Sequence, residues 1–213
     1  MLRKLLLPAL IATVFGCVAS NAYVVEQTQT DGTMKLSYPL VYETNPTVQH
    51  AINTDIARYV VSEKAVYETG KAQVVELSYQ VAYEDDNYLS IILTPYHYYG
   101  GAHGHYKQIG RVYDKHTGNV LPLSYFVHIN SAEQLTEGLR NHSLKLYSQT
   151  RRIPMSLDRA WKDVPYISDS YYLDGNGFIE LIYQPYELGP FAVGATRIEI
   201  SPTAAEDFNK LNK

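Results

Sequence analysis

Three histidines lie close together in an aromatic, glycine-rich passage, residues 96–106, which reads YHYYGGAHGHY. His103 and His105 are two residues apart, so on an extended chain both imidazoles project to the same side. His97, before the glycines, could add a third nitrogen and complete an open three-histidine site that activates a water molecule. One interpretation of this passage is therefore a metal-dependent hydrolase centred on His97, His103 and His105.

The same passage also reads as a glycine turn that displays rings. Gly100, Gly101 and Gly104 permit a backbone with positive φ or a close approach of two chain segments. The passage contains no carboxylate that could complete a metal site, and histidines beside turns are commonly surface or hydrogen-bonding groups. We therefore expect no metal or other cofactor, and the three-histidine site remains the alternative.

The rest of the sequence lacks the familiar catalytic motifs. It contains no G-x-S-x-G elbow, no H-E-x-x-H pair and no phosphate-binding glycine loop. The only cysteine, Cys17, lies in the N-terminal segment. Two carboxylates that meet only in the folded chain leave no sequence motif, so a glycosidase pair stays open. We predict no catalytic residues and a protein that is not an enzyme.

A second ring-rich passage follows a predicted strand at residues 183–194, YQPYELGPFAVG. Its two prolines and two glycines indicate either a wide, rigid loop that displays its rings or a buried corner that packs them. Together the two passages suggest one candidate binding surface: His97, Tyr98, Tyr99, His103, His105, Tyr186, Glu187 and Phe191. We predict that five glycines shape structural turns, namely Gly100, Gly101, Gly104, Gly118 and Gly194.

The N-terminal residues have the layout of a signal peptide. Two cations, Arg3 and Lys4, precede an apolar run, and Ser20-Asn21-Ala22 forms a small-x-small cleavage site. We therefore expect a signal peptide over residues 1–22 and an exported protein, periplasmic or extracellular. A membrane anchor is one alternative. A lipid on Cys17 is another, because Gly16-Cys17 resembles the cleavage site of bacterial lipoproteins.

Charge and composition narrow the partners. The 213 residues carry a formal charge of −4, and removing Arg3 and Lys4 with the signal peptide would change it from −4 to −6. Such a surface repels nucleic acid and favours basic partners. After the signal peptide, no apolar run approaches the length of a membrane span. The 20 tyrosines against 5 phenylalanines suit half-buried strands or a binding surface.

Hydrophobic periodicity predicts an α+β fold. Period-two alternation predicts strands at 34–42, 72–83, 88–99, 105–114, 119–123, 170–174, 178–186 and 195–200. Helical spacing predicts one helix from Asn45 to Tyr67 and a second from Ser131, with Leu135, Leu139, His142 and Leu146 on its inner stripe. A short C-terminal helix follows Ser201. We expect a mostly antiparallel sheet in one domain, 23–213, which could divide into two small lobes, about 23–70 plus strands and 71–213.

Four stretches, in this order, resemble one known family. They are SYPLVYETNPTVQHAINTDIARYV at 37–60, YYGGAHGHY at 98–106, VYDKHTGNVLPLSYF at 112–126 and YQPYELGPFAVG at 183–194. This set resembles the RsiV-like extracytoplasmic domain, over about residues 33–201. The family includes the lysozyme-binding outer domain of an anti-sigma factor and the non-catalytic N-terminal module of a peptidoglycan deacetylase.

The resemblance implies an exported α+β domain with a binding role. The sequence shows neither a cytoplasmic sigma-binding segment nor a deacetylase catalytic domain, so we expect a stand-alone secreted member. Lysozyme, or another basic cell-wall hydrolase, is the partner that the resemblance implies. A module that binds peptidoglycan or another carbohydrate, with tyrosine faces stacked on sugar rings, is the alternative.

Overall fold

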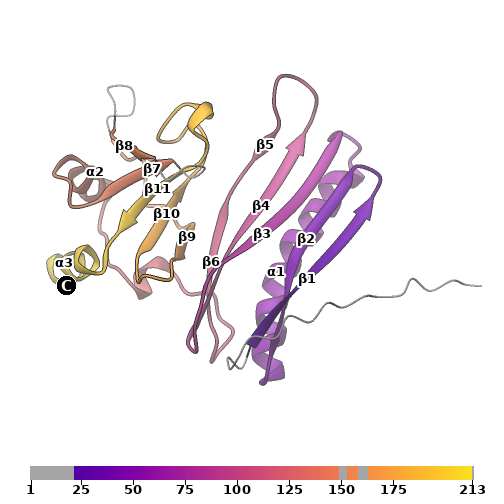
Figure 1. Ribbon diagram of the computed structural model, residues 1–213, viewed down its shortest axis with the longest axis horizontal. Helices are drawn as coiled ribbons and strands as arrows, with labels where there is room; N and C mark the ends of the chain where they lie inside the picture. Colours follow the sequence, from indigo (N-terminus) through magenta and orange to yellow (C-terminus); the bar gives the residue numbers. More distant parts are fainter. Residues whose placement is uncertain (1–21, 149–152, 158–162, 213) are drawn as a thin grey trace, which may run out of the picture.

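The described part of the chain forms two β-sheets, the first covered by one helix and the second by two (Figure 1). The structure, a computed structural model, describes residues 22–148, 153–157 and 163–212. The expected signal peptide and Cys17 therefore lie outside the described residues, apart from Ala22. The first sheet and its helix occupy the right half of the view, and the second sheet occupies the left half.

The first sheet has six strands around one long helix. The strands run in the order β1-β2-β3-β4-β5, and β6 pairs with an earlier part of β4 than the short β5 does. Their bounds are β1 Ala22–Asp31, β2 Met34–Glu43, β3 Val74–Glu84, β4 Tyr88–Tyr98, β5 His105–Tyr106 and β6 Ile109–Asp114, with α1 at Pro46–Glu68. Only β2 and β3 pair in parallel, because α1 connects them as a crossover.

Helix α1 follows the sequence signals closely. The Asn45 side chain accepts a hydrogen bond from the Thr47 amide, and Pro46 occupies the first turn. Its buried stripe, Val48, Ile52, Ile56 and Val60, packs on the apolar face of the first sheet. Glu63 occupies the next position of the stripe and is buried too. Residues 23–70 thus share one core with β3, β4 and β6.

The second sheet has five strands in the order β8-β7-β11-β10-β9, all antiparallel. Its elements are α2 Ala132–Arg140, β7 Lys145–Ser148, β8 Pro154–Met155, β9 Tyr171–Leu173, β10 Ile179–Tyr183, β11 Thr196–Ile200 and α3 Pro202–Leu211, with short 3-10 turns η1 Leu123–Tyr125 and η2 Phe191–Val193. One core unites this sheet with α2 and α3, and it also takes in Val112 of β6. The predicted α+β fold with mostly antiparallel sheets is confirmed.

Four local expectations need correction. The helix from Ser131 ends at Arg140, because Leu144 folds back against Gly138, so His142 and Leu146 are not on its stripe. The strand expected at 105–114 is interrupted after Tyr106 and resumes at Ile109. The strand expected at 119–123 is a single bridge between Val120 and Tyr113. Strands β1, β7 and β8 were not expected.

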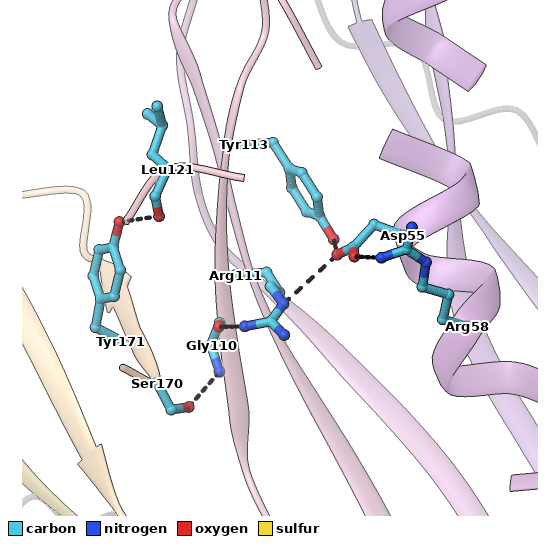
Figure 2. Close-up of polar contacts among 8 residues, drawn as sticks. All are labelled: Asp55, Arg58, Gly110, Arg111, Tyr113, Leu121, Ser170 and Tyr171. Carbon is cyan, nitrogen blue, oxygen red and sulfur yellow. Dashed lines mark hydrogen bonds and ion pairs between the residues drawn. The ribbon is translucent and has the colours of Figure 1, made fainter. Parts of the chain in front are cut away.

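The two sheets meet at an unusually close contact between β6 and β9 (Figure 2). The Gly110 amide donates to the Ser170 hydroxyl at 2.9 Å, and the Tyr171 hydroxyl donates to the Leu121 carbonyl at 2.7 Å. A Cβ on Gly110 would lie 2.0 Å from the Tyr171 carbonyl oxygen. The two backbones can therefore approach this closely only because residue 110 has no side chain.

On the other face of β6, charged side chains join the strand to α1 (Figure 2). Asp55 accepts a hydrogen bond from the Tyr113 hydroxyl at 2.9 Å. The same carboxylate lies 3.6 Å from Arg111 and 3.6 Å from Arg58. Alternate residues of β6 thus hold α1 on one side and the second sheet on the other.

Three tyrosines are fully buried, and each has a partner for its hydroxyl. Tyr113 bonds to Asp55, Tyr171 to the Leu121 carbonyl and Tyr183 to the Tyr166 carbonyl. Burial raises the pKa of all three phenols, because the charged phenolate would lose its hydration.

No helix in the described part of the chain is long and apolar enough to cross a membrane.

The close contact at Gly110 predicts a sharp difference between two glycines. Gly110→Ala should lower the free energy of unfolding by about 2 kcal/mol, because the new methyl group would collide with the Tyr171 backbone. Gly175→Ala is the matched control, because its Cβ would make only an ordinary contact, 3.8 Å from Tyr83. Urea denaturation of both variants checks this, and equal stability of the two would contradict the packing.

The buried tyrosines predict a loss of stability at high pH. Above about pH 10 an unfolded chain releases its tyrosine protons, whereas the folded chain retains them at these three positions. The free energy of unfolding should then fall by about 1.4 kcal/mol per pH unit for each such tyrosine. Urea titrations between pH 8 and 11 measure the slope. Tyr113→Phe should make that slope shallower, and an unchanged slope would exclude this residue as a cause.

Candidate functional site

A groove of about 500 Å³ forms where α1, the β4–β5 hairpin and the loop after β10 meet. Tyr59 lines it from α1, and Ile109 lines it from the start of β6. The β4–β5 hairpin contributes His97, His105 and Tyr106, and the loop contributes Tyr186 and Phe191. The two passages singled out in the sequence therefore face one hollow, together with residues of α1 that the sequence did not suggest.

His97 is tied to the buried acid of α1. Its Nε2 lies 2.5 Å from a carboxylate oxygen of Glu63, whose side chain is 7% exposed, whereas that of His97 is 22% exposed. The carboxylate fixes the orientation of the imidazole, and the same hydrogen bond gives one of the buried carboxylate oxygens a partner. Among the described residues, Glu63 is the only acid that lines the groove, and it is already engaged.

A row of rings forms the rim of the groove. His103 stacks on Phe191 with ring centres 4.0 Å apart and planes 22° apart. The Tyr186 ring lies on Phe191 as well, with ring centres 5.5 Å apart and planes 34° apart. Tyr99 lies against both His97, at 6.0 Å, and His105, at 6.2 Å. The row joins the β4–β5 turn to the loop of the second sheet.

Glycines shape the β4–β5 turn in two different ways. Gly100 and Gly101 have φ values of 93° and 110°, which L side chains rarely adopt. Gly104 has no such backbone, but a Cβ there would lie 2.3 Å from the Tyr96 ring. The Tyr98 hydroxyl closes the turn by donating to the Gly101 carbonyl at 2.9 Å.

The two remaining turn glycines lie outside the groove. Gly118 has a φ of 76° and packs against Val48 and Ala51 of α1. Gly194 has a φ of 74° and ends η2. Both positions have the left-handed backbone for which glycine is best suited.

Side chains within the loop after β10 hold it to the first sheet. The side-chain amide of Gln184 donates to the Gln108 carbonyl and accepts from the Gln108 backbone amide, each at 2.8 Å. The side chain of Glu187 accepts from the backbone amide of Gln184 at 2.6 Å. Glu187 also bonds to Tyr166, and burial together with this hydrogen bond raises the pKa of the Tyr166 phenol. Glu187 therefore closes the loop and does not line the groove.

The three histidines do not form a metal site. His97 bonds to Glu63, whereas Nδ1 of His103 bonds to the Gly104 carbonyl and its ring stacks on Phe191. Among residues 22–148, 153–157 and 163–212, no three histidine, cysteine, aspartate or glutamate side chains converge to hold a metal ion. The three-histidine hydrolase therefore has no support from the geometry.

The structure divides the predicted surface into three parts. Four residues line the groove: His97, His105, Tyr186 and Phe191. His103 and Tyr99 extend it through ring contacts, and Tyr98 and Glu187 stabilise their own loops. Sequence reasoning missed several lining residues: Tyr59, Glu63, Tyr106, Lys107 and Gln184. One signal was available, because Glu63 interrupts an otherwise apolar helical stripe.

Comparisons with known proteins match the two halves of the chain separately. Residues 26–106 match the family described as Deacetylase PdaC, and residues 126–202 match a family described as a protein of unknown function, DUF3298. The first match contains α1 and the β4–β5 hairpin, and the second contains the loop after β10. The groove therefore takes its walls from both matches. No curated protein matches the chain in sequence.

Two solved structures share the fold over most of their length. A DUF3298 family protein from Pseudomonas aeruginosa PAO1 is 18% identical with a TM-score of 0.56, covering 87% of this chain and 91% of its own. A DUF3298 family member from Bacteroides fragilis NCTC 9343 is 16% identical with a TM-score of 0.53, covering 88% of this chain and 92% of its own. At this identity the likeness concerns the fold alone.

The β4–β5 turn predicts losses of stability of different size for two nearby substitutions. Gly101→Val should lower the free energy of unfolding by roughly 1–3 kcal/mol, because a β-branched residue is strained at a φ of 110°. His103→Ala should cost only about 1 kcal/mol, since the ring is exposed and loses one stacking contact with Phe191 and one hydrogen bond to the adjacent Gly104 carbonyl. Thermal denaturation compares the two, and a greater loss for His103→Ala would reverse the assigned roles.

Proposed function

We propose that this chain, which carries a PdaC domain followed by a DUF3298 domain, is a non-enzymatic binding protein of the bacterial cell envelope. Domains of these families are typically extracytoplasmic. The aromatic groove between α1, the β4–β5 hairpin and the loop after β10 is its binding site. One observation carries the proposal: ring faces from both halves line this hollow, while its acid is engaged internally.

The inventory of polar groups argues against catalysis in the groove. Glu63 is bonded to His97, and both amide atoms of Gln184 are bonded to the Gln108 backbone. The Tyr106 hydroxyl accepts from the Ala195 amide. These groups are used to hold the walls in place, which leaves ring surfaces as the main feature offered to a ligand. Aromatic surface with few competing charges is typical of the centre of a protein–protein interface.

The more specific proposal is that the partner is lysozyme or a similar basic cell-wall hydrolase. The formal charge of −4 favours the approach of a basic protein at long range. The groove then supplies the contact area for the docked complex. A glycan is the competing ligand, since the apolar face of a sugar ring also packs on aromatic rings. Sugar hydroxyls, however, are recognised by several polar groups, and here one oxygen of Glu63 and the side-chain oxygen of Gln184 already have partners within the chain.

Calorimetry at low salt tests the proposal directly. The protein should bind lysozyme measurably, and the affinity should fall as salt screens the charge attraction. Phe191→Ala should weaken binding at least about tenfold, or 1.4 kcal/mol, because it removes the central ring of the row. A matched control is Tyr23→Ala, which removes an exposed ring from β1, the opposite edge strand of the first sheet.

Three outcomes separate the possibilities. Absence of lysozyme binding at low salt would exclude the specific partner. Equal weakening by Tyr23→Ala and Phe191→Ala would exclude the groove as the site. Co-sedimentation with purified cell-wall sacculi, without lysozyme binding, would favour the carbohydrate-binding module instead.

A further inference from the structure

We infer that Tyr186 is the anchor residue of this protein-binding groove, and that a strained turn holds its ring in position for the partner. The inference rests on the proposed function and deepens it. It assigns one residue as the main contact, and it assigns the backbone conformation of the loop a role in presenting that contact.

The backbone at Tyr186 is unusual for its residue type. Its φ is 75°, and in the described part of the chain only one other non-glycine residue, His142, has a positive φ. The Glu187 amide donates to the Gln184 carbonyl at 3.1 Å, which closes a four-residue turn with Pro185 second and Tyr186 third. A turn with proline second and a positive φ third is of type II, where glycine or asparagine normally occupies the third position.

Core packing does not account for this strained tyrosine. Tyr186 is 60% exposed, so its ring lies mostly in solvent. A bulky residue in the left-handed region costs free energy, which glycine at the same position would avoid. Strain that is retained at an exposed residue beside a groove points to a role in binding.

The neighbouring residues make the turn rigid. Gln184 clamps it to the Gln108 backbone through two hydrogen bonds, and Glu187 accepts from the Gln184 amide. Phe191 supports the Tyr186 ring from within the groove and is itself stacked on His103. A ring fixed in this way loses little conformational freedom when a partner binds, which improves affinity without additional contacts.

The contacts of the turn also indicate the kind of partner. A tyrosine that projects from a turn fits a pocket on a protein surface, where tyrosine is among the commonest anchors. A glycan is held by several polar groups beside a ring, whereas here the two carboxylates nearest the turn, Glu63 and Glu187, each use an oxygen to hold the chain itself. We therefore assign a protein partner with an apolar pocket for the ring, basic overall to match the acidic chain.

Two substitutions separate strain from contact. Tyr186→Asn removes the ring but tolerates a positive φ, so it should leave the melting temperature unchanged or raise it. It should weaken lysozyme binding at least tenfold. Tyr186→Phe keeps the ring and should bind within threefold of the unchanged protein. Tyr23→Asn is the matched control, since Tyr23 is also 60% exposed but lies in an ordinary strand. It should lower the melting temperature and leave binding unaltered.

The outcomes distinguish this inference from the proposed function. If lysozyme binds the unchanged protein and Tyr186→Asn equally well, only the anchor is overturned. If Tyr186→Asn lowers the melting temperature as much as Tyr23→Asn does, the strained turn is overturned. If the unchanged protein binds only cell-wall sacculi, or neither probe, the anchor falls together with protein capture.

Discussion

The absence of a side chain at Gly110 is the constraint on which the arrangement of this protein depends. With no Cβ there, the backbones of β6 and β9 come into direct contact, and the second sheet rests on the face of the first sheet that α1 leaves free. This contact also places the loop after β10 beside β5, where Gln184 can reach Gln108. Any displacement of β9 from β6 would therefore open the groove, because its walls belong to opposite sides of the junction.

Hydrogen bonds inside the site maintain its form. Carboxylate, amide and hydroxyl groups that would serve catalysis in another protein here connect elements far apart in sequence: Glu63 to His97, Gln184 to Gln108, and Tyr106 to Ala195. Each bond gives a partner to a polar group that would otherwise lower the stability of the fold by being removed from water without one. The surface that remains for a ligand is mainly ring and proline.

Sequence reasoning succeeded where a signal is local and failed where a distant segment decides. The Asn45 cap, the apolar stripe of α1 and the β3–β4 hairpin are encoded by neighbours, and the structure has them as expected. The break after Tyr106 depends instead on Gln184, whose side chain replaces a strand partner from 76 residues away. The orientation of His97 depends on Glu63, 34 residues earlier. Spacing alone suggested that the three histidines share a metal ion. They do lie near one another, with the His103 and His105 rings 5.6 Å apart, but His97 is bonded to Glu63 and His103 is stacked on Phe191.

The tyrosine excess has two physical origins that the sequence could not separate. Tyr113, Tyr171 and Tyr183 are core residues whose hydroxyls reach polar partners, so each fills a large volume without leaving its oxygen unsatisfied. Tyr186 has the opposite environment, because its ring is mostly exposed on a strained backbone. The same residue type thus stabilises the junction of the sheets and lines the groove beside it. Since the groove is lined by residues of both matched segments and by Lys107 and Ile109 between them, a site of this composition requires both halves of the chain to be folded together.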